Sequence, residues 1–193
     1  VKNALGCFYN IVMTVLFKNK NSDAQSSQPL PTAYRQWIPA AGGRNIGMDP
    51  ALKAKLQKQR YHIVGEHGGV KTCHWTKESL LRDRSCYKGT FYGVKSHTCM
   101  QMSPVVDQCN LACTYCWREP HMDTLELTDQ DPLELLYESV RAQRRLLSGF
   151  GGNDKVPKEK FLEAQDPKHV AISLNGEPTL YTRLGEYMDL CHK

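Results

Sequence analysis

The sequence predicts an α/β fold that forms the start of a (β/α) barrel. Residues 98–106 and 169–174 are short apolar runs with the length of buried strands, and each is followed by a loop. A helical pattern follows each loop, and this alternation of strand, loop and helix is typical of such a barrel. The chain has 193 residues, of which 40% are hydrophobic and 23% charged, so it is large enough for one domain with its own core.

The segment before residue 48 differs in composition from the rest. Residues 1–17 are apolar and fit a short helix or a short strand, whereas residues 18–47 are rich in Ser, Gln, Pro and Gly, as in a flexible linker. The apolar run 4–17 has no cleavage site, and at about 14 residues it is shorter than the roughly 20 that span a bilayer. We therefore expect no membrane partner and a reducing, cytoplasmic location.

Two helix-start signals follow. Asp49 and Pro50 have the character of an N-cap and a first helical proline, and they predict a helix to about Arg60. Residues 76–79 open a second, shorter helix, and a long loop that holds two cysteines comes next.

The same cap and proline recur at Asp131 and Pro132, which predicts a helix to about Ser148, stopped by the following glycine. Residues 151–160 then form a basic, glycine-rich loop, and a last helix starts near 179–181. The long helix carries four apolar residues at helical spacing, which we expect on its inward face: Leu133, Leu136, Val140 and Leu147.

The loop after the first strand holds a C-x3-C-x2-C run formed by Cys109, Cys113 and Cys116. Three thiolates can hold three irons of a four-iron four-sulfur cluster and leave the fourth iron open for a reactant. A structural zinc needs four ligands, so the last two cysteines alone would be half of a zinc ribbon. The third cysteine and the place between strand and helix favour the cluster, with zinc as the alternative.

Three more cysteines precede that loop in equal steps of 13 residues: Cys73, Cys86 and Cys99. We expect them near the first set, as ligands of a second cluster with an open iron. The alternative is three free cysteines packed as small hydrophobes. Their polar neighbours, among them His74 and His97, argue against deep burial.

Two further places carry candidate chemistry. Lys88 lies two residues after Cys86 among aromatic residues, where a lysine can form a Schiff base with a keto acid, although the residues alone favour an ordinary surface lysine. Residues 175–178 follow the second strand, where Glu177 can accept hydrogen bonds from a substrate ammonium; a simple turn is the alternative. The net charge of +5 is compatible with an RNA partner but not diagnostic of one.

From about Met48 onward the chain resembles the tRNA 4-demethylwyosine synthases, radical S-adenosylmethionine enzymes of wyosine-base synthesis. The resemblance implies that residues 48–193 are a truncated N-terminal portion of a partial radical SAM (β/α) barrel, with an added cluster-binding segment at 60–100. The stretches that carry it include Val70-Lys71-Thr72-Cys73-His74-Trp75, Cys86-Tyr87-Lys88, Gln101-Met102-Ser103-Pro104, Cys116-Trp117-Arg118 and Ala171-Ile172-Ser173-Leu174-Asn175-Gly176-Glu177-Pro178.

The resemblance also implies roles for residues. The downstream cysteines would hold the radical-generating cluster and the upstream cysteines a second four-iron four-sulfur cluster. Lys88 would handle pyruvate, either by a Schiff base or by orienting it at the open iron of the second cluster, which reverses the expectation from the residues alone. Tyr115 would lie near the adenine of S-adenosylmethionine and Glu177 would hold its amino group. The cofactor-binding residues are then Tyr115, Asn175, Gly176 and Glu177.

The implied reaction condenses N1-methylguanosine, next to the anticodon of phenylalanine tRNA, with pyruvate to give 4-demethylwyosine. It belongs to the carbon–carbon lyases, and it needs an external electron donor for the cluster. A 5′-deoxyadenosyl radical removes hydrogen from the N1-methyl group, and the carbon radical attacks pyruvate. We expect this chain to keep the cluster ligands but not to turn over alone. The alternatives are a zinc-bearing RNA-binding module without catalysis and a radical enzyme with another substrate.

Overall fold

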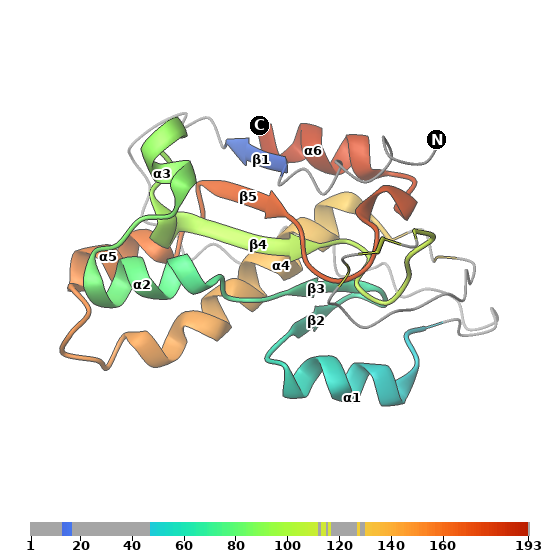
Figure 1. Ribbon diagram of the computed structural model, residues 1–193, viewed down its shortest axis with the longest axis horizontal. Helices are drawn as coiled ribbons and strands as arrows, with labels where there is room; N and C mark the ends of the chain where they lie inside the picture. Colours follow the sequence, from blue (N-terminus) through green and yellow to red (C-terminus); the bar gives the residue numbers. More distant parts are fainter. Residues whose placement is uncertain are drawn as a thin grey trace, which may run out of the picture.

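The computed structural model describes residues 13–16, 47–111, 113–114, 116, 127 and 130–192 (Figure 1). In these residues a five-stranded sheet has the order β1-β5-β4-β3-β2. Its strands are β1 Met13–Leu16, β2 His62–Val64, β3 Gly68–Val70, β4 Cys99–Ser103 and β5 His169–Ile172. The helices are α1 Pro50–Lys58, α2 His74–Arg82, α3 Tyr87–Tyr92, α4 Pro132–Leu147, α5 Lys158–Ala164 and α6 Leu184–His192. Three short 3-10 helices are η3 Ser96–Thr98, η4 Ser148–Phe150 and η5 Pro178–Leu180.

The two predicted strands form the centre of the sheet. β4 and β5 are parallel, with Cys99 opposite His169 and Met102 opposite Ile172. α4 lies in the connection between them, as a (β/α) barrel requires. The other pairings are antiparallel: β1 adds to β5, β3 to β4, and β2 to β3. The α/β class and the parallel start of a barrel are therefore confirmed.

The main core lies between the sheet and the helices α4 and α6 (Figure 1). Met100 and Met102 of β4 point into it together with Val170 and Ile172 of β5. Side chains alternate between the two faces of a strand, so the residues between them face the opposite side. Cys99, Gln101, Ala171 and Ser173 accordingly line a cavity there.

The predicted helix starts are confirmed in detail. The Asp49 carboxylate accepts a hydrogen bond from Leu52 N at 2.9 Å, and Pro50 is the first helical residue. Asp131 does the same for α4, accepting from Leu133 N and Glu134 N at 3.0 and 3.1 Å. These bonds satisfy amide groups that a helix start leaves without a partner in the helix.

Several local expectations were wrong. The segment expected as a long loop after α2 contains α3 and η3, and the loop expected at 151–160 ends inside α5. The expected inward face of α4 is right only in part: Leu136 and Val140 pack against the main core but are partly buried, and fully buried residues lie one position before each of them. Of the four expected residues only Leu147 is fully buried; the buried residues of α4 are Pro132, Leu135, Ser139, Ala142, Gln143 and Leu147.

The segment before residue 48 is described only in part. Residues 13–16 form β1 at the edge of the sheet beside β5, so the strand alternative for this apolar run is the correct one there. The expected linker at 18–47 lies outside the described residues except for its last position.

Candidate functional site

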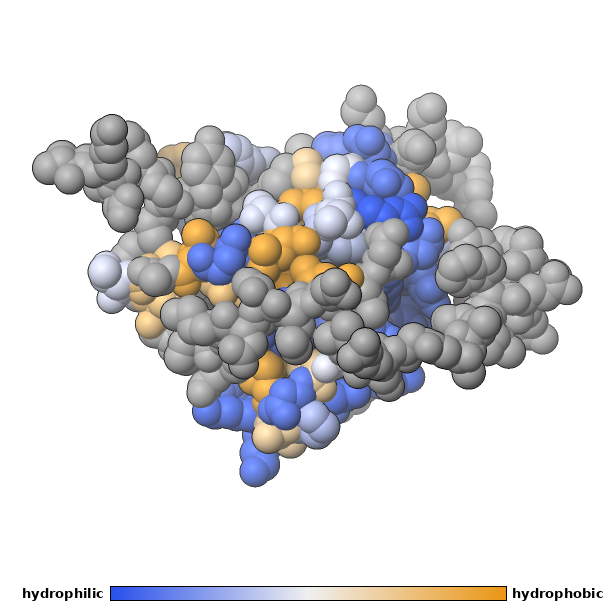
Figure 2. Space-filling model, turned by 90° about the vertical axis from the view of Figure 1, so that its right-hand side faces the viewer, coloured by the Kyte–Doolittle hydropathy of each residue, from blue (hydrophilic) through white to orange (hydrophobic). Residues whose placement is uncertain are grey.

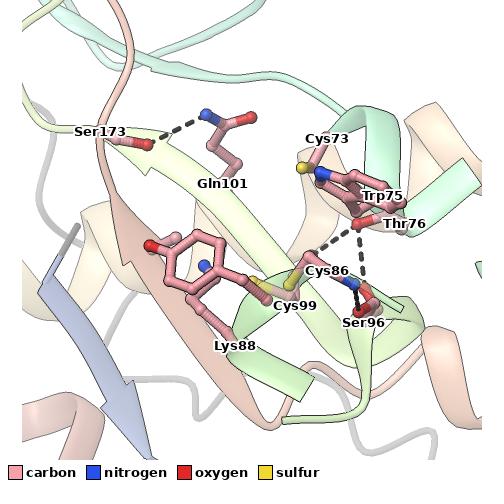
Figure 3. Close-up of a pocket in the computed structure, with 11 residues that line it drawn as sticks. Cys73, Trp75, Thr76, Cys86, Lys88, Ser96, Cys99, Gln101 and Ser173 are labelled. Carbon is pink, nitrogen blue, oxygen red and sulfur yellow. Dashed lines mark hydrogen bonds between the residues drawn. The ribbon is translucent and has the colours of Figure 1, made fainter. Parts of the chain in front are cut away.

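The upstream cysteines converge on one cavity of about 140 Å³, together with Lys88 (Figure 3). Each cysteine marks the start of an element: Cys73 precedes α2, Cys86 precedes α3, and Cys99 opens β4. The first step of the equal spacing contains α2, and the second contains α3 and η3. The remaining lining residues are Trp75, Thr76, Tyr87, Ser96, Gln101, Ala171 and Ser173.

Lys88 lies in the first turn of α3 and is 9% exposed, so it is not the surface lysine that the residues alone favour. Its Nζ lies 3.7 Å from the Sγ of Cys99. The aromatic residues around it in the sequence are more exposed: Tyr87, Phe91 and Tyr92 are 56%, 73% and 71% exposed, and Tyr87 also lines the cavity. The helix thus turns the Lys88 amine inward and the rings of Phe91 and Tyr92 toward solvent.

The upstream thiols differ in acidity. Burial raises the pKa of Cys99 to about 11, although the Lys88 ammonium opposes that shift. Burial also acts to raise the pKa of Cys86, but the hydrogen bond with Ser96, the backbone amides of Gly89 and Lys88, and the Lys88 charge together leave that pKa below its usual value. A cluster would need all three as thiolates, so its binding would release protons.

The expectation of shallow burial was wrong for two of these cysteines. Cys86 and Cys99 are each 4% exposed, and only Cys73 is half-buried. The polar neighbours do not prevent burial because they are hydrogen-bonded themselves. His97, for example, bonds Ser79 Oγ through Nδ1 at 3.2 Å and Glu163 Oε2 through Nε2 at 2.8 Å.

The downstream cysteines lie in the loop that leaves the carboxyl end of β4. Cys109 and Cys113 are half-buried and Cys116 is exposed, and Cys116 N donates to Cys113 O at 3.0 Å. Tyr115, expected near the adenine of a cofactor, lies outside the described residues. None of these three residues is fully buried, so a small cofactor can reach them at the carboxyl end of the parallel strands.

Buried bonds hold the start of this loop in place. His67 Nδ1 and Asp107 Oδ2 are 2.7 Å apart, and both side chains are buried. Val106 N donates to His67 O at 2.8 Å. The hairpin of β2 and β3, which the sequence did not reveal, therefore anchors the residues that lead into Cys109.

The loop after β5 packs against the same place. Asn175 Nδ2 donates to Val106 O at 2.9 Å, and Glu177 N donates to Gln108 O at 2.8 Å. Gly176 has φ +77°, and a Cβ there would lie 2.3 Å from Val105 O. Two backbones thus meet at a distance that only glycine allows.

Glu177 is 8% exposed and serves the turn in which it lies. Its Oε1 accepts hydrogen bonds from Thr179 N at 3.0 Å and Thr179 Oγ1 at 2.6 Å, which caps η5. These hydrogen bonds fit the alternative that residues 175–178 form a simple turn. The cofactor role of Asn175, Gly176 and Glu177 stays a prediction.

Three buried polar atoms at this junction have no hydrogen-bond partner among the described residues: Asp107 Oδ1, Gln108 Nε2 and Asn175 Oδ1. Leaving a buried polar atom unpaired costs about 1–3 kcal/mol, so such a set points to a ligand or water that completes it. Asp107 and Gln108 were not among the predicted site residues, although they directly precede Cys109. The junction therefore fits a polar cofactor beside the downstream cysteines.

The two cysteine groups lie at opposite ends of one strand rather than side by side. Cys99 is the first residue of β4, and the loop of Cys109 leaves its other end (Figure 1). Four residue steps of about 3.3 Å give about 13 Å along the strand. Figure 2 looks onto the loop end and shows hydrophobic residues in the middle of that face, bordered by hydrophilic ones.

A metal site is not preformed in the described residues. No three Cys, His, Asp or Glu side chains among them come close enough to hold a metal ion. The donor chemistry nevertheless fits: soft thiolates are the ligands of iron–sulfur clusters, and the upstream set encloses a cavity.

Exposure predicts which thiols react in the metal-free chain. At pH 8 Cys116 should be alkylated by iodoacetamide at least about tenfold faster than Cys191, because Cys191 is fully buried and burial raises its pKa to about 12. A raised pKa leaves the thiol protonated at pH 8, and only the thiolate reacts. Peptide mass spectrometry over time measures both rates, and equal rates would contradict the burial of Cys191.

In the part of the chain that the structure describes, no helix has the length and apolar character needed to cross a membrane.

Comparison with known proteins gives close relatives. The chain is 48% identical over 154 residues to the S-adenosyl-L-methionine-dependent tRNA 4-demethylwyosine synthase of Pyrococcus abyssi, a match that covers 77% of this chain and 44% of that protein. It is 38% identical over 156 residues to the human protein TYW1 of the same name, covering 79% of this chain and 21% of the other. The chain thus spans less than half the length of these relatives. No protein-family model matches it.

Solved structures agree with these relatives. A structure of TYW1 with a lysine–pyruvate adduct bound superposes with a TM-score of 0.69 at 39% identity, over 75% of this chain and 48% of the other. A crystal structure of archaeal TYW1 superposes with a TM-score of 0.63 at 36% identity, with the same coverage. Both support the fold described above.

Proposed function

The chain is homologous to the N-terminal part of the S-adenosyl-L-methionine-dependent tRNA 4-demethylwyosine synthases. We propose that it is the portion of such an enzyme that holds two iron–sulfur clusters, binds S-adenosyl-L-methionine and captures pyruvate. The whole enzyme would condense N1-methylguanosine of phenylalanine tRNA with pyruvate, as a radical carbon–carbon lyase. The observation that carries the proposal is the cavity where buried Lys88 meets Cys73, Cys86 and Cys99. A relative of this fold holds a lysine–pyruvate adduct.

At the loop end, Cys109, Cys113 and Cys116 would hold the radical-generating cluster. When bound, that cluster supplies the electron that cleaves S-adenosyl-L-methionine and starts the radical reaction. The unpaired atoms of Asp107, Gln108 and Asn175 support a polar cofactor beside it. The protein's own task there is to hold the cofactor in place, which the buried pair of His67 and Asp107 supports by fixing the entry to the loop.

At the cavity end, Cys73, Cys86 and Cys99 would hold the second cluster and Lys88 would capture pyruvate. The neutral Lys88 amine attacks the keto carbon, the carbonyl oxygen leaves as water, and an imine links the two. Burial of Lys88 limits the access of bulk water, which would otherwise hydrolyse the imine. The cysteines would remain reduced in the cytoplasm, where we place the reaction.

The RNA would approach over a cationic surface. The exposed face of α1 carries Lys53 and Lys58, Arg60 follows the helix, and no acidic residue lies between Asp49 and Glu66. Leu52 of the same helix packs beside Val106 and Leu174, which follow β4 and β5. The basic helix therefore borders the loop end of the sheet, where phosphate contacts would position a tRNA.

Since the chain spans less than half of its relatives, we do not expect it to complete the reaction alone.

Metal analysis tests this proposal. After anaerobic reconstitution, the chain should bind about eight irons and as many sulfides, four for each cluster. Cys109→Ala and Cys99→Ala should each remove about four irons, because each variant disrupts one group. Cys191→Ala is the matched control and should leave the iron content unchanged, since Cys191 lies in α6 within the main core.

Two other results would contradict the proposal and favour the alternatives. One or two zinc ions with little iron would favour a zinc-bearing RNA-binding module. Full iron content with no capture of pyruvate at Lys88 would favour a radical enzyme with another substrate.

A further inference from the structure

We propose that Gln101 and Ser173 bind the carboxylate of the keto acid that Lys88 captures, and thereby select a keto acid over a neutral ketone. This inference rests on the proposed function and adds two residues that act on specificity. Gln101 Nε2 and Ser173 Oγ are 3.0 Å apart, and both residues line the cavity that contains Lys88 (Figure 3).

The strands determine where this pair lies. Gln101 follows Cys99 by two residues on β4, so both side chains point to the same face. Ser173 follows β5, and its N donates to Met102 O at 2.9 Å, which continues the parallel pairing. The Gln101–Ser173 pair therefore lies two residues beyond Cys99 along the strand, on the way to the downstream cysteines. A ligand joined to Lys88 would extend along the strands toward this pair.

The two other aliphatic hydroxyl groups of the cavity, those of Thr76 and Ser96, already bond to the backbone. Thr76 Oγ1 donates to Ser96 O at 3.1 Å and to Cys99 O at 3.3 Å. Ser96 Oγ accepts from Cys86 N at 3.0 Å. Among the described residues, the side chains of Gln101 and Ser173 hydrogen-bond only to each other, so the pair keeps donors for a ligand.

The chemistry of the pair suits an anion. When Ser173 Oγ accepts from Gln101 Nε2, its own O–H and the second N–H of the amide remain available. Two adjacent donors match the oxygens of one carboxylate, and hydrogen bonds to a charged group are stronger than neutral ones. Gln101 and Ser173 line the same cavity of about 140 Å³ as Lys88, so a keto acid joined to Lys88 forms beside these donors.

The covalent step leaves the carboxylate untouched, so an anchor can hold it throughout. The Lys88 amine forms a bond to the keto carbon, the carbonyl oxygen takes up two protons and leaves as water, and the carbon–nitrogen double bond replaces the carbon–oxygen one. No electrons are exchanged with any other group. Sodium cyanoborohydride then reduces the imine to a stable secondary amine on Lys88.

The experiment uses the full 193-residue chain, pyruvate or methyl pyruvate, and cyanoborohydride, with the adduct on Lys88 measured by peptide mass spectrometry. Gln101→Leu and Ser173→Ala should each raise the half-saturating pyruvate concentration about tenfold, with little change in the maximal rate. The half-saturating concentration of methyl pyruvate, which lacks the charge, should stay within about twofold in both variants.

A third variant should reverse the preference between pyruvate and methyl pyruvate. Gln101→Glu places a negative charge against the carboxylate, so this variant should prefer methyl pyruvate to pyruvate. Gln57→Leu on the exposed side of α1 is the control for loss of a glutamine and should behave as the unmodified chain. Thermal unfolding of every variant separates loss of binding from loss of fold.

The outcomes distinguish the inference from the proposal beneath it. Unchanged preference for pyruvate in Gln101→Leu and Gln101→Glu, with Lys88 still modified, would overturn the anchor while leaving capture by Lys88 intact. Absence of any adduct on Lys88 in the unmodified chain would overturn capture itself, and the anchor with it.

Discussion

Replacement of Lys88 by arginine should abolish the covalent capture of pyruvate. Arginine keeps the positive charge beside Cys99, but its guanidinium is protonated at all accessible pH values and forms no imine. The adduct at this position should therefore fall by at least about a hundredfold, which corresponds to more than about 2.7 kcal/mol. Mass spectrometry of the intact chain after reduction with cyanoborohydride measures the loss.

The matched control is Lys95→Arg. Lys95 lies seven positions further along, its side chain is 62% exposed, and its Nζ pairs with Glu163 Oε2 at 3.1 Å. Lys95 does not line the cavity of Lys88 and the upstream cysteines, and its ammonium is held by a carboxylate, so this variant should form as much adduct as the unmodified chain. Adduct retained in Lys88→Arg at the level of Lys95→Arg would show that other lysines capture pyruvate, and the assignment of Lys88 would fall.

The parts of the fold that the sequence predicted are those with strong local signals. Asp49 with Pro50 and Asp131 with Pro132 determine helix starts through their own side chains and ring geometry, with no help from distant residues. The parallel pair of β4 and β5 follows from two apolar runs with a helix between them. Such features are visible in a few consecutive residues.

The missed elements depend on tertiary contacts. β2 and β3 have three residues each, and the β3 sequence Gly68-Gly69-Val70 shows no alternation that predicts a strand. Their pairing is fixed by β4 and by packing against α4. α3 has only six residues, which is too short for a helical period to be recognised.

In the candidate site too, some features were predicted from the sequence and others depend on tertiary contacts. The spacing of the cysteines predicted two groups of thiols, and the structure gathers the upstream group around one cavity. Their placement at opposite ends of β4 follows only from the topology, and the burial of Lys88 only from the direction of α3. Gln101 and Ser173 meet because β4 and β5 are parallel and in register, a relation between residues 72 positions apart.

Substitution of Gly176 by alanine should destabilise the chain by at least about 3 kcal/mol, the largest stability effect expected here. The backbone of Gly176 has φ +77°, a conformation that costs an alanine about 1–2 kcal/mol. The added Cβ would also lie 2.3 Å from Val105 O and 2.9 Å from Gln108 O, and both obstacles are backbone atoms that cannot rotate away. Urea unfolding followed by circular dichroism measures the loss.

Gly152→Ala is the matched control, because Gly152 is exposed and an added Cβ there meets no atom within 4 Å. It should change the free energy of unfolding by no more than about 0.5–1 kcal/mol. A loss in Gly152→Ala as large as in Gly176→Ala would mean that the close approach of the two loops is not the cause.

The position of Gly176 also predicts which function fails first. The backbone shift that alanine forces would break the bond from Glu177 N to Gln108 O, which ties the loop after β5 to the residue before Cys109. In Gly176→Ala, kept at low temperature and without urea, the amount of iron bound by the downstream cysteines should therefore fall. The adduct on Lys88, at the other end of β4, should persist. Equal loss of both would indicate global unfolding, and intact iron with a large loss of stability would separate the fold of this junction from its proposed role beside the cofactor.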